Sequence, residues 1–222
     1  MKIDPSFIWT AFVKLLSAIP TTLLITAVSV SVGFMIGLVA AFVRIYKVPV
    51  LSQIATAYVT FIRGTPMLTH LLLIYFGLPV LVDALSAQMS WGFKSSSIPM
   101  IWFAFISFSI TAGAYMSEVI RSGLLAVNRG QLEAGYSIGM TTWQALRRIV
   151  FPQALAVSLP NLSNSVIGML HGSTLAFTVS VVDINAQAQI VASTNWKFFE
   201  SFGGGSYFLG TYAPHRETDR NH

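Results

Sequence analysis

The chain has 222 residues, of which 54% are hydrophobic and 9% are charged, and it carries a net charge of +5 and no cysteine. A soluble domain carries about 25% charged residues, so this composition excludes an ordinary soluble protein and indicates a single-domain integral membrane protein. The lack of cysteine excludes disulfides, thiol nucleophiles and cysteine-based metal sites. The positive charge is scattered, which suits loops facing anionic lipid better than a nucleic-acid surface.

The apolar segments predict an all-α, polytopic transmembrane helical bundle. Apolar residues at helical spacing over residues 7–16 fit either an amphipathic helix at the interface or the start of the first span. A spanning helix needs roughly 20 apolar residues. Four stretches meet this length, at about residues 15–43, 64–82, 95–117 and 151–182. They predict a transmembrane domain over residues 1–202, followed by an atypical polar tail at residues 203–222.

The first span contains a G-x-x-x-G pair, Gly33 and Gly37. Such a pair lets two helices approach closely. The second helix could belong to another subunit, but packing within the same chain is the simpler expectation.

The last apolar stretch is unusually polar, since it contains Pro160, Asn161, Asn164 and His171. Polar groups at membrane depth normally face a bundle interior or a water-filled cavity. Asn161 and Asn164 could therefore line a cavity or form hydrogen bonds between helices. The stretch holds no acidic residue, so it offers no counter-charge to a strongly cationic group.

The distribution of lysine and arginine predicts the orientation. These residues are more frequent in the loops after the first and third spans than on the opposite side. Because basic loops tend to stay in the cytoplasm, we expect the N-terminus outside and the loop at about residues 118–150 inside.

This loop gathers two glutamates, several arginines and several glycines outside the bilayer. Residues 131–138 can form a short helix, and Gly139 is suited to end it. Thr141 and Gln144 match the capping box that begins another helix.

The short helix has features of a docking element. Ala134 and Gly135 give it a low-profile face, and the helix dipole favours Glu133 near its N-terminus. Such a helix could fit a groove on a soluble partner. An ordinary solvated loop is the alternative interpretation.

Part of this loop resembles the EAA loop of ABC importer permeases, in which EAA and a later glycine precede I-x-L-P. The matching residues are Glu133, Ala134, Gly139, Ile149 and Pro152. Two positions depart from the pattern, because Gly135 stands where the third letter is usually alanine and Phe151 stands where leucine is usual.

Other segments resemble the polar amino acid uptake branch of that superfamily, which includes histidine, glutamine and cystine types. They are Ala114–Glu118 with Arg121, Gly123, Val127, Gly130 and Gln131, then Phe61–Pro66, and then Ile74–Pro79. Within the branch, Gly172–Phe177 and Val181–Ile184 are similar to cystine permeases. The resemblance covers about residues 15–202.

The resemblance implies a transport subunit of an ATP-driven importer for a polar amino acid, L-cystine being the finer expectation, in the bacterial cytoplasmic membrane. Two permease subunits, identical or paralogous, would form the pathway, two ATPase subunits would dock at the EAA loops, and an extracytoplasmic binding protein would deliver the substrate. The chain has no G-x-x-x-x-G-K-[ST] sequence, so we expect no enzymatic activity and no cofactor in it, with ATP and Mg bound by the partner ATPase.

The resemblance also implies two sets of functional residues. Coupling to the ATPase is expected at Glu133, Ala134, Gly135, Gly139 and Arg121. The substrate pathway is expected at His171, Ser173, Thr174, Asn164 and Asn161. His171 stands where relatives often carry lysine, so it could meet the substrate carboxylate, or it could be a core histidine bonded to a neighbouring helix.

A structural role is expected for Arg63, Gly64, Thr65 and Pro66. The last three would shape a bend at the start of the second span. Arg63 would pair with Glu118 or cap backbone carbonyls. His70, on an otherwise apolar face, is expected to serve packing rather than gating.

Permeases of this branch usually carry five spans, and the fifth should begin near Phe198, where the sequence shows no apolar run of that length. A truncated or frame-shifted permease that binds the ATPase without transporting is therefore an alternative. A self-contained channel or secondary carrier is a weaker one, because it would need no coupling helix and no internal repeat is evident.

Overall fold

The computed structural model describes residues 5–198 and 201–202, which form helices joined by short loops, with no strand among them. Three of these helices are long and apolar enough to cross a membrane. They are α2 (Ile19–Ile45), α4 (Met67–Met89) and α5 (Met100–Ala126). Residues 142–179 and 184–194 form a pair bent by 52°, which makes a fourth crossing if it is counted as one span.

Shorter elements complete the chain. They are α1 (Pro5–Leu16), α3 (Leu51–Gly64), η1 (Ser95–Ser97), α6 (Arg129–Ser137), α7 (Thr142–Ala145), η2 (Leu146–Val150), α8 (Phe151–Gly172), η3 (Ser173–Val179) and α9 (Ile184–Asn195). The helical bundle predicted from the sequence is confirmed. The tail expected at residues 203–222 lies outside the described residues.

Several boundaries differ from the sequence-based expectation. α5 continues past Glu118 and Arg121, which had been assigned to the cytoplasmic loop, because these charges pair with one another and with Arg44 instead of ending the helix. α3 occupies residues expected to form a loop. The stretch 151–182 is divided between α8 and the tighter turns of η3.

The bundle is held together mainly where α2 crosses α5. A Cβ atom added to Gly33 would lie 2.5 Å from the Cβ of Ala112, and one added to Gly37 would lie 2.9 Å from the Gly113 carbonyl oxygen. Only glycine lets the backbones approach this closely. The G-x-x-x-G pair therefore packs within the chain, as expected.

A buried apolar cluster joins α2, α4, α5 and η3. Its members are Ile25, Leu71, Ala104, Phe108, Ala176, Val179 and Val181. The cluster packs residues 176–181 against α2, α4 and α5. It therefore fixes the position of the bend that follows α8.

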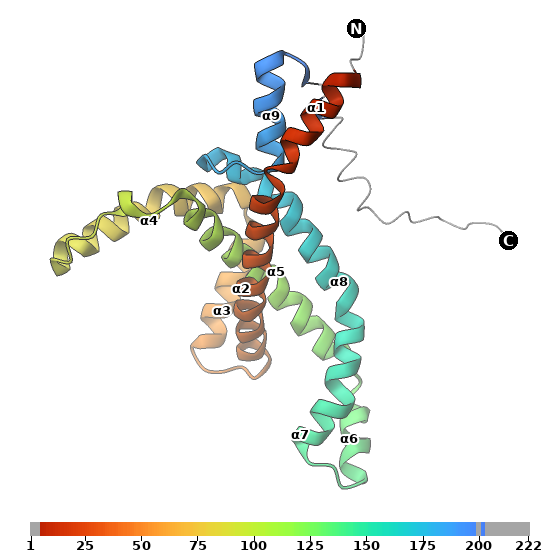
Figure 1. Ribbon diagram of the computed structural model, residues 1–222. Coiled ribbons are helices and arrows are strands. Elements are labelled where there is room, and N and C mark those ends of the chain that lie inside the picture. The colour runs from red at the N-terminus through yellow and green to blue at the C-terminus, as the bar shows by residue number, and fades with distance from the viewer. Residues whose placement is uncertain (1–4, 199–200, 203–222) are drawn as a thin grey trace.

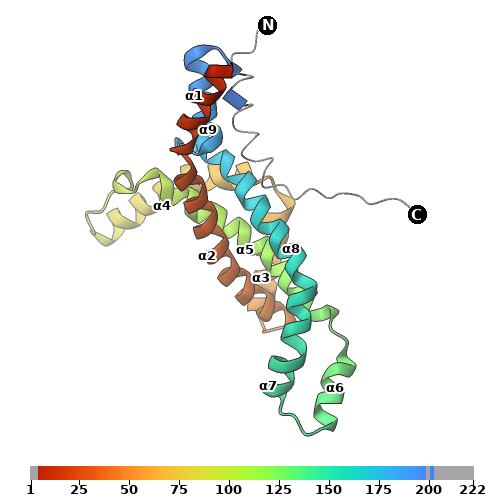
Figure 2. The same ribbon diagram turned by 45° about the vertical axis from the view of Figure 1, so that its right-hand side comes forward.

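The helices divide into a central bundle and three extensions (Figures 1 and 2). α1 packs on α9 at one end through a cluster that includes Ala11, Leu15 and Ala188. α6 and α7 lie at the opposite end. α4 runs outward from the bundle, and most of its side chains are exposed. The structure thus has α1 as a separate helix that is not continuous with the first span.

α9 is fixed at its first turn. Asp183 is fully buried and caps the helix by accepting a hydrogen bond of 2.8 Å from the Ala186 amide. The Ile184 amide donates to Thr22 Oγ1 of α2 at 3.0 Å. These bonds anchor the bend between η3 and α9 to the start of the first span.

Candidate functional site: the coupling hairpin and the polar face of α8

The segment expected from the sequence to couple to an ATPase lies in a hairpin of residues 128–150, named the coupling hairpin after that expectation, which projects beyond the bundle (Figures 1 and 2). Asn128 begins α6 by accepting a 2.8 Å hydrogen bond from the Gly130 amide. After α6 the chain reverses at Gly139, whose φ of +79° favours glycine. Thr141 and Gln144 then form the predicted capping box, with reciprocal bonds of 3.0 and 3.3 Å.

The hairpin has an inner and an outer face. Gly135 is buried, and a Cβ atom there would lie 3.3 Å from Ala145 and 3.2 Å from Ile149. Glu133 and Ala134 are exposed. Ala134 and Gly135, which the sequence predicted to share one low-profile face, therefore lie on opposite faces. Gly135 allows the close packing within the hairpin, whereas Glu133 and Ala134 face outward.

Large apolar side chains are exposed on the same hairpin, and the sequence reasoning missed them. Ile138 is 74% exposed and Trp143 is 63% exposed, and Tyr136 is also exposed. Exposed large apolar side chains outside the spanning helices are typical of surfaces that contact another protein. Their presence in an otherwise polar loop was the signal available in the sequence.

Arg121 lies in the last turns of α5, outside the hairpin, in a cluster of three charges. Arg44 Nη1 contacts Glu118 Oε2 at 2.8 Å, and Arg121 donates hydrogen bonds to Glu118 Oε1. The cluster joins the ends of α2 and α5 that lie nearest the hairpin. Arg63 was expected to pair with Glu118 or to cap backbone carbonyls, but within the described residues its guanidinium instead lies 5.7 Å from the centre of the Tyr115 ring.

The residues expected in the substrate pathway separate into two groups. Asn161, Asn164 and His171 share one face of α8 at spacings of three and seven residues, and all three are exposed. None of their side chains has a hydrogen-bond partner within the described residues. These three side chains therefore lie on an open face of the described chain, without the bonds to neighbouring helices that were the alternative expectation.

The other two pathway candidates point elsewhere. Ser173 is fully buried and donates to the Leu170 carbonyl at 2.8 Å. The Thr174 hydroxyl donates to the His171 carbonyl at 2.8 Å. Both hydroxyls are therefore used within η3 and its junction with α8.

A buried histidine organises the break between α3 and α4. Thr65 and Pro66 have extended backbone between the two helices, and a Cβ atom on Gly64 would meet nothing within 4 Å. Thr65 Oγ1 donates to the Phe61 carbonyl at 2.8 Å and contacts His70 Nε2 at 2.5 Å.

The hydrogen-bond chain assigns the tautomer of His70. The Thr65 hydroxyl proton is already donated to the Phe61 carbonyl, so the proton between Thr65 and His70 belongs to Nε2. His70 Nδ1 lies 3.3 Å from the Thr111 hydroxyl of α5, and a neutral ring accepts a hydrogen bond from that hydroxyl. His70 thus joins the helix break to α5, a role more specific than packing alone.

Comparison with known proteins agrees with this arrangement. The family described as the inner membrane component of binding-protein-dependent transport systems matches residues 33–209. The probable amino-acid ABC transporter permease PatM of Vibrio harveyi is 38% identical over 194 residues, covering 85% of this chain and 80% of PatM. The L-cystine permease TcyL of Bacillus subtilis is 38% identical over 186 residues, covering 83% of this chain and 75% of TcyL.

A solved structure shows the same fold. A crystal structure of an amino acid ABC transporter with histidines aligns with a TM-score of 0.77 at 33% identity, covering 95% of this chain and 94% of that one. With its helices of spanning length, the chain is a multi-pass protein of the cytoplasmic membrane. It belongs to the inner membrane components of binding-protein-dependent transport systems and, among them, to the amino-acid ABC importer permeases.

Proposed function

We propose that the chain couples ATP hydrolysis in a partner to the import of a polar amino acid, and that the outer face of the coupling hairpin is where the ATPase docks. The observation that carries this proposal is the hairpin itself, which extends beyond the bundle with Glu133, Ile138 and Trp143 exposed. A projecting element with an exposed apolar surface suits insertion into a groove of a soluble subunit. ATP and Mg would be bound by that subunit.

Rigid attachment supports the coupling role. α7 continues through η2 directly into α8, so a displacement of the hairpin would be transmitted along α8. Gly135 keeps α6 closely packed on that continuous segment. In this proposal residues 1–202 form the permease domain and residues 118–150 include its coupling segment.

The exposed polar face of α8 would line the substrate pathway. Asn161 and Asn164 offer amide donors and acceptors, and His171 offers an imidazole, all without partners in the described residues. Such groups can bind the carboxylate and ammonium of a zwitterion. A second permease subunit, identical or paralogous, would close the pathway opposite this face, and an extracytoplasmic binding protein would deliver the substrate.

Cystine is the substrate we propose. The relative TcyL is an L-cystine permease, and Gly172–Phe177 and Val181–Ile184 are the segments that resemble cystine permeases. The test is uptake of labelled cystine by cells that lack their own cystine systems and express this chain with its ATPase and binding protein. Energy-dependent uptake that unlabelled cystine suppresses, and that excess glutamine, arginine or histidine does not, is the expected result.

Charge reversal tests the docking face. Glu133→Lys should lower copurification of the ATPase and cystine uptake by about tenfold, since it places a positive charge in the docking surface. Ile138→Asp should act in the same direction through the apolar part of that surface. Lys47→Glu, a reversal in the loop between α2 and α3, is the matched control and should leave both measurements unchanged.

Two results would contradict parts of this proposal. Full uptake by Glu133→Lys without any ATPase would indicate a self-contained carrier. Normal ATPase binding without uptake of any amino acid would favour the alternative of a permease that docks but does not transport.

A further inference from the structure

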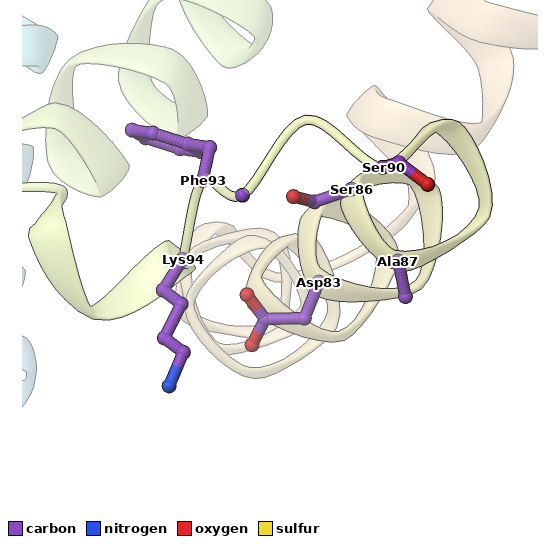
Figure 3. A pocket seen from close by; sticks show the side chains of 7 residues that line it. Asp83, Ser86, Ala87, Ser90, Phe93 and Lys94 are labelled. Carbon is purple, nitrogen blue, oxygen red and sulfur yellow. The ribbon is translucent and has the colours of Figure 1, made fainter.

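The loop between α4 and α5 forms a cavity that the transport proposal does not use. Its volume is about 660 Å³, within the range of small-molecule sites. The lining residues are Asp83, Ser86, Ala87, Ser90, Gly92, Phe93 and Lys94 (Figure 3). The loop joins two helices of spanning length, so it lies at a membrane boundary, at the end of α5 away from the coupling hairpin.

The cavity contains a carboxylate that is already held in place. Asp83 Oδ1 accepts a 2.7 Å hydrogen bond from the Ser95 amide, and Oδ2 accepts a 2.7 Å bond from the Ser95 hydroxyl. A carboxylate offers about four acceptor positions, so both oxygens can accept further bonds. Asp83 is thus a preoriented acceptor for a cationic group.

Ser86 supplies an unused hydroxyl. The residue is only 6% exposed, and Figure 3 shows its hydroxyl directed toward the loop. This hydroxyl has no hydrogen-bond partner among the described residues, whereas those of Thr22 and Thr26 donate to carbonyls one turn back. Its oxygen is not fully buried, so it can donate a hydrogen bond to a ligand in this cavity.

Lys94 supplies the opposite charge. In Figure 3 its side chain and the Asp83 carboxylate extend from the two walls toward the same side of the cavity. Within the described residues Lys94 forms no salt bridge. The Lys94 ammonium acts electrostatically on the Asp83 carboxylate across the cavity, and these two charges match a ligand that carries both a cationic and an anionic group.

The surroundings of the cavity are apolar and exposed. Leu85, Met89, Trp91 and Phe93 are each about half or more exposed around it, and Trp91 reaches 70%. Aromatic side chains are typical of the membrane–water interface. A water-soluble ligand would gain little from this rim, whereas the glycerol and acyl chains of a lipid would cover it.

We propose that the cavity binds the headgroup of a phospholipid that carries a primary ammonium group, of the phosphatidylethanolamine type. The ammonium lies on Asp83, the phosphate accepts hydrogen bonds from Lys94 and Ser86, and the acyl chains run along the exposed apolar side of α4.

The test is a lipid titration of the purified full chain in detergent, followed by native mass spectrometry, with three phospholipids of identical acyl chains. Phosphatidylethanolamine should bind about tenfold more tightly than phosphatidylcholine, because a quaternary ammonium cannot donate a hydrogen bond to Asp83. Phosphatidylglycerol, which lacks the ammonium, should bind as weakly as phosphatidylcholine.

Variants test the individual contacts. Lys94→Gln should weaken phosphatidylethanolamine binding about tenfold, Lys94→Arg should retain it, and Ser86→Ala should weaken it about threefold. Asp83→Asn should remove the preference over phosphatidylcholine. Lys47→Gln, an exposed lysine in another interhelical loop, is the control and should bind as the unaltered chain does. Unchanged helical circular dichroism establishes that each variant is folded.

Three outcomes would overturn the proposal. Equal binding of all three lipids would show that the site does not distinguish between their headgroups. Binding of glycerophosphoethanolamine as tightly as the lipid would assign the cavity to a soluble zwitterion. Unaltered lipid binding by Lys94→Gln, together with weakened docking of the binding protein, would make the loop a protein contact.

Discussion

α4 and α5 are both long enough to cross the membrane, but they use their surfaces in opposite ways. α4 is the more apolar helix, yet only 11% of its most apolar stretch is buried, compared with 67% for α5. In water the more apolar helix would be the buried one. In a bilayer, lipid tails are as apolar as leucine, so close packing and hydrogen bonds decide which helix is buried.

The composition of the two helices reflects this difference. The residues of α5 buried among its neighbours are largely small or hydroxylated, including Ser107, Thr111, Ala112, Gly113 and Ser117. The exposed residues of α4 include Leu73, Phe76, Val80 and Leu81. Small residues let α2 approach α5, whereas large ones on α4 meet lipid or another subunit. Apolarity in this chain therefore indicates where a helix can lie, and side-chain size indicates what it packs against.

The largest effect should come from removing matching aromatic rings from the two helices. Phe108 of α5 is 1% exposed within the apolar cluster, whereas Phe76 of α4 is 66% exposed. Phe108→Ala should lower the free energy of unfolding by about 3 kcal/mol through the cavity it leaves. Phe76→Ala should change it by less than about 0.5 kcal/mol. Unfolding titrations in mixed micelles measure both, and equal losses would show that α4 is as well packed as α5.

Glycine substitutions should differ in sign between the two regions. Gly33→Ala should destabilise the protein by about 2 kcal/mol, because its Cβ would meet Ala112 at 2.5 Å. A Cβ on Gly77 of α4 would meet nothing within 4 Å. Gly77→Ala should therefore stabilise the helix by about 0.5–1 kcal/mol. The same titrations apply, and destabilisation by both variants would contradict the α2–α5 crossing as the site of close contact.

The charge cluster at the end of α5 should contribute less than the crossing. The Glu118 side chain is 23% exposed and forms salt bridges with both Arg44 and Arg121. Glu118→Gln should cost about 1.5 kcal/mol, because two partly buried guanidinium groups lose their shared counter-charge. Glu133→Gln, on the exposed hairpin, is the matched control and should remain within about 0.5 kcal/mol of the unaltered chain. If high salt lowers the free energy of unfolding of the unaltered protein by as much as Glu118→Gln does, the salt bridges are instead solvent-exposed surface pairs.

The smallest effect should come from the junction that joins α4 to α5. His70→Leu should cost about 1 kcal/mol by removing the bonds to Thr65 and Thr111. His70→Gln should recover most of this loss, because a carboxamide can both donate to Thr65 and accept from Thr111. In the unaltered protein, nitrogen-15 NMR should show a neutral ring protonated at Nε2. A ring protonated at Nδ1 would reverse the assigned direction of the hydrogen bonds.

The coupling hairpin shows how far sequence reasoning reached. The short helix, the turn at Gly139 and the capping box of Thr141 and Gln144 were all predicted, because each depends on residues close together in the chain. The opposite exposure of Ala134 and Gly135 was not predicted. It depends on Ala145 and Ile149, which reach Gly135 only after the chain has reversed.

The sequence by itself determined the membrane class, the helical architecture, the family and the local turns of this protein. These follow from apolar length, caps and motifs, all of which are readable along the chain. The tertiary structure alone decided the partners of the charges and the directions of the polar groups. Arg63 lies on Tyr115 and Glu118 binds Arg44, while Asn161, Asn164 and His171 share an open face. Such pairings depend on how helices far apart in the sequence cross, and lipid favours no single crossing through apolarity alone.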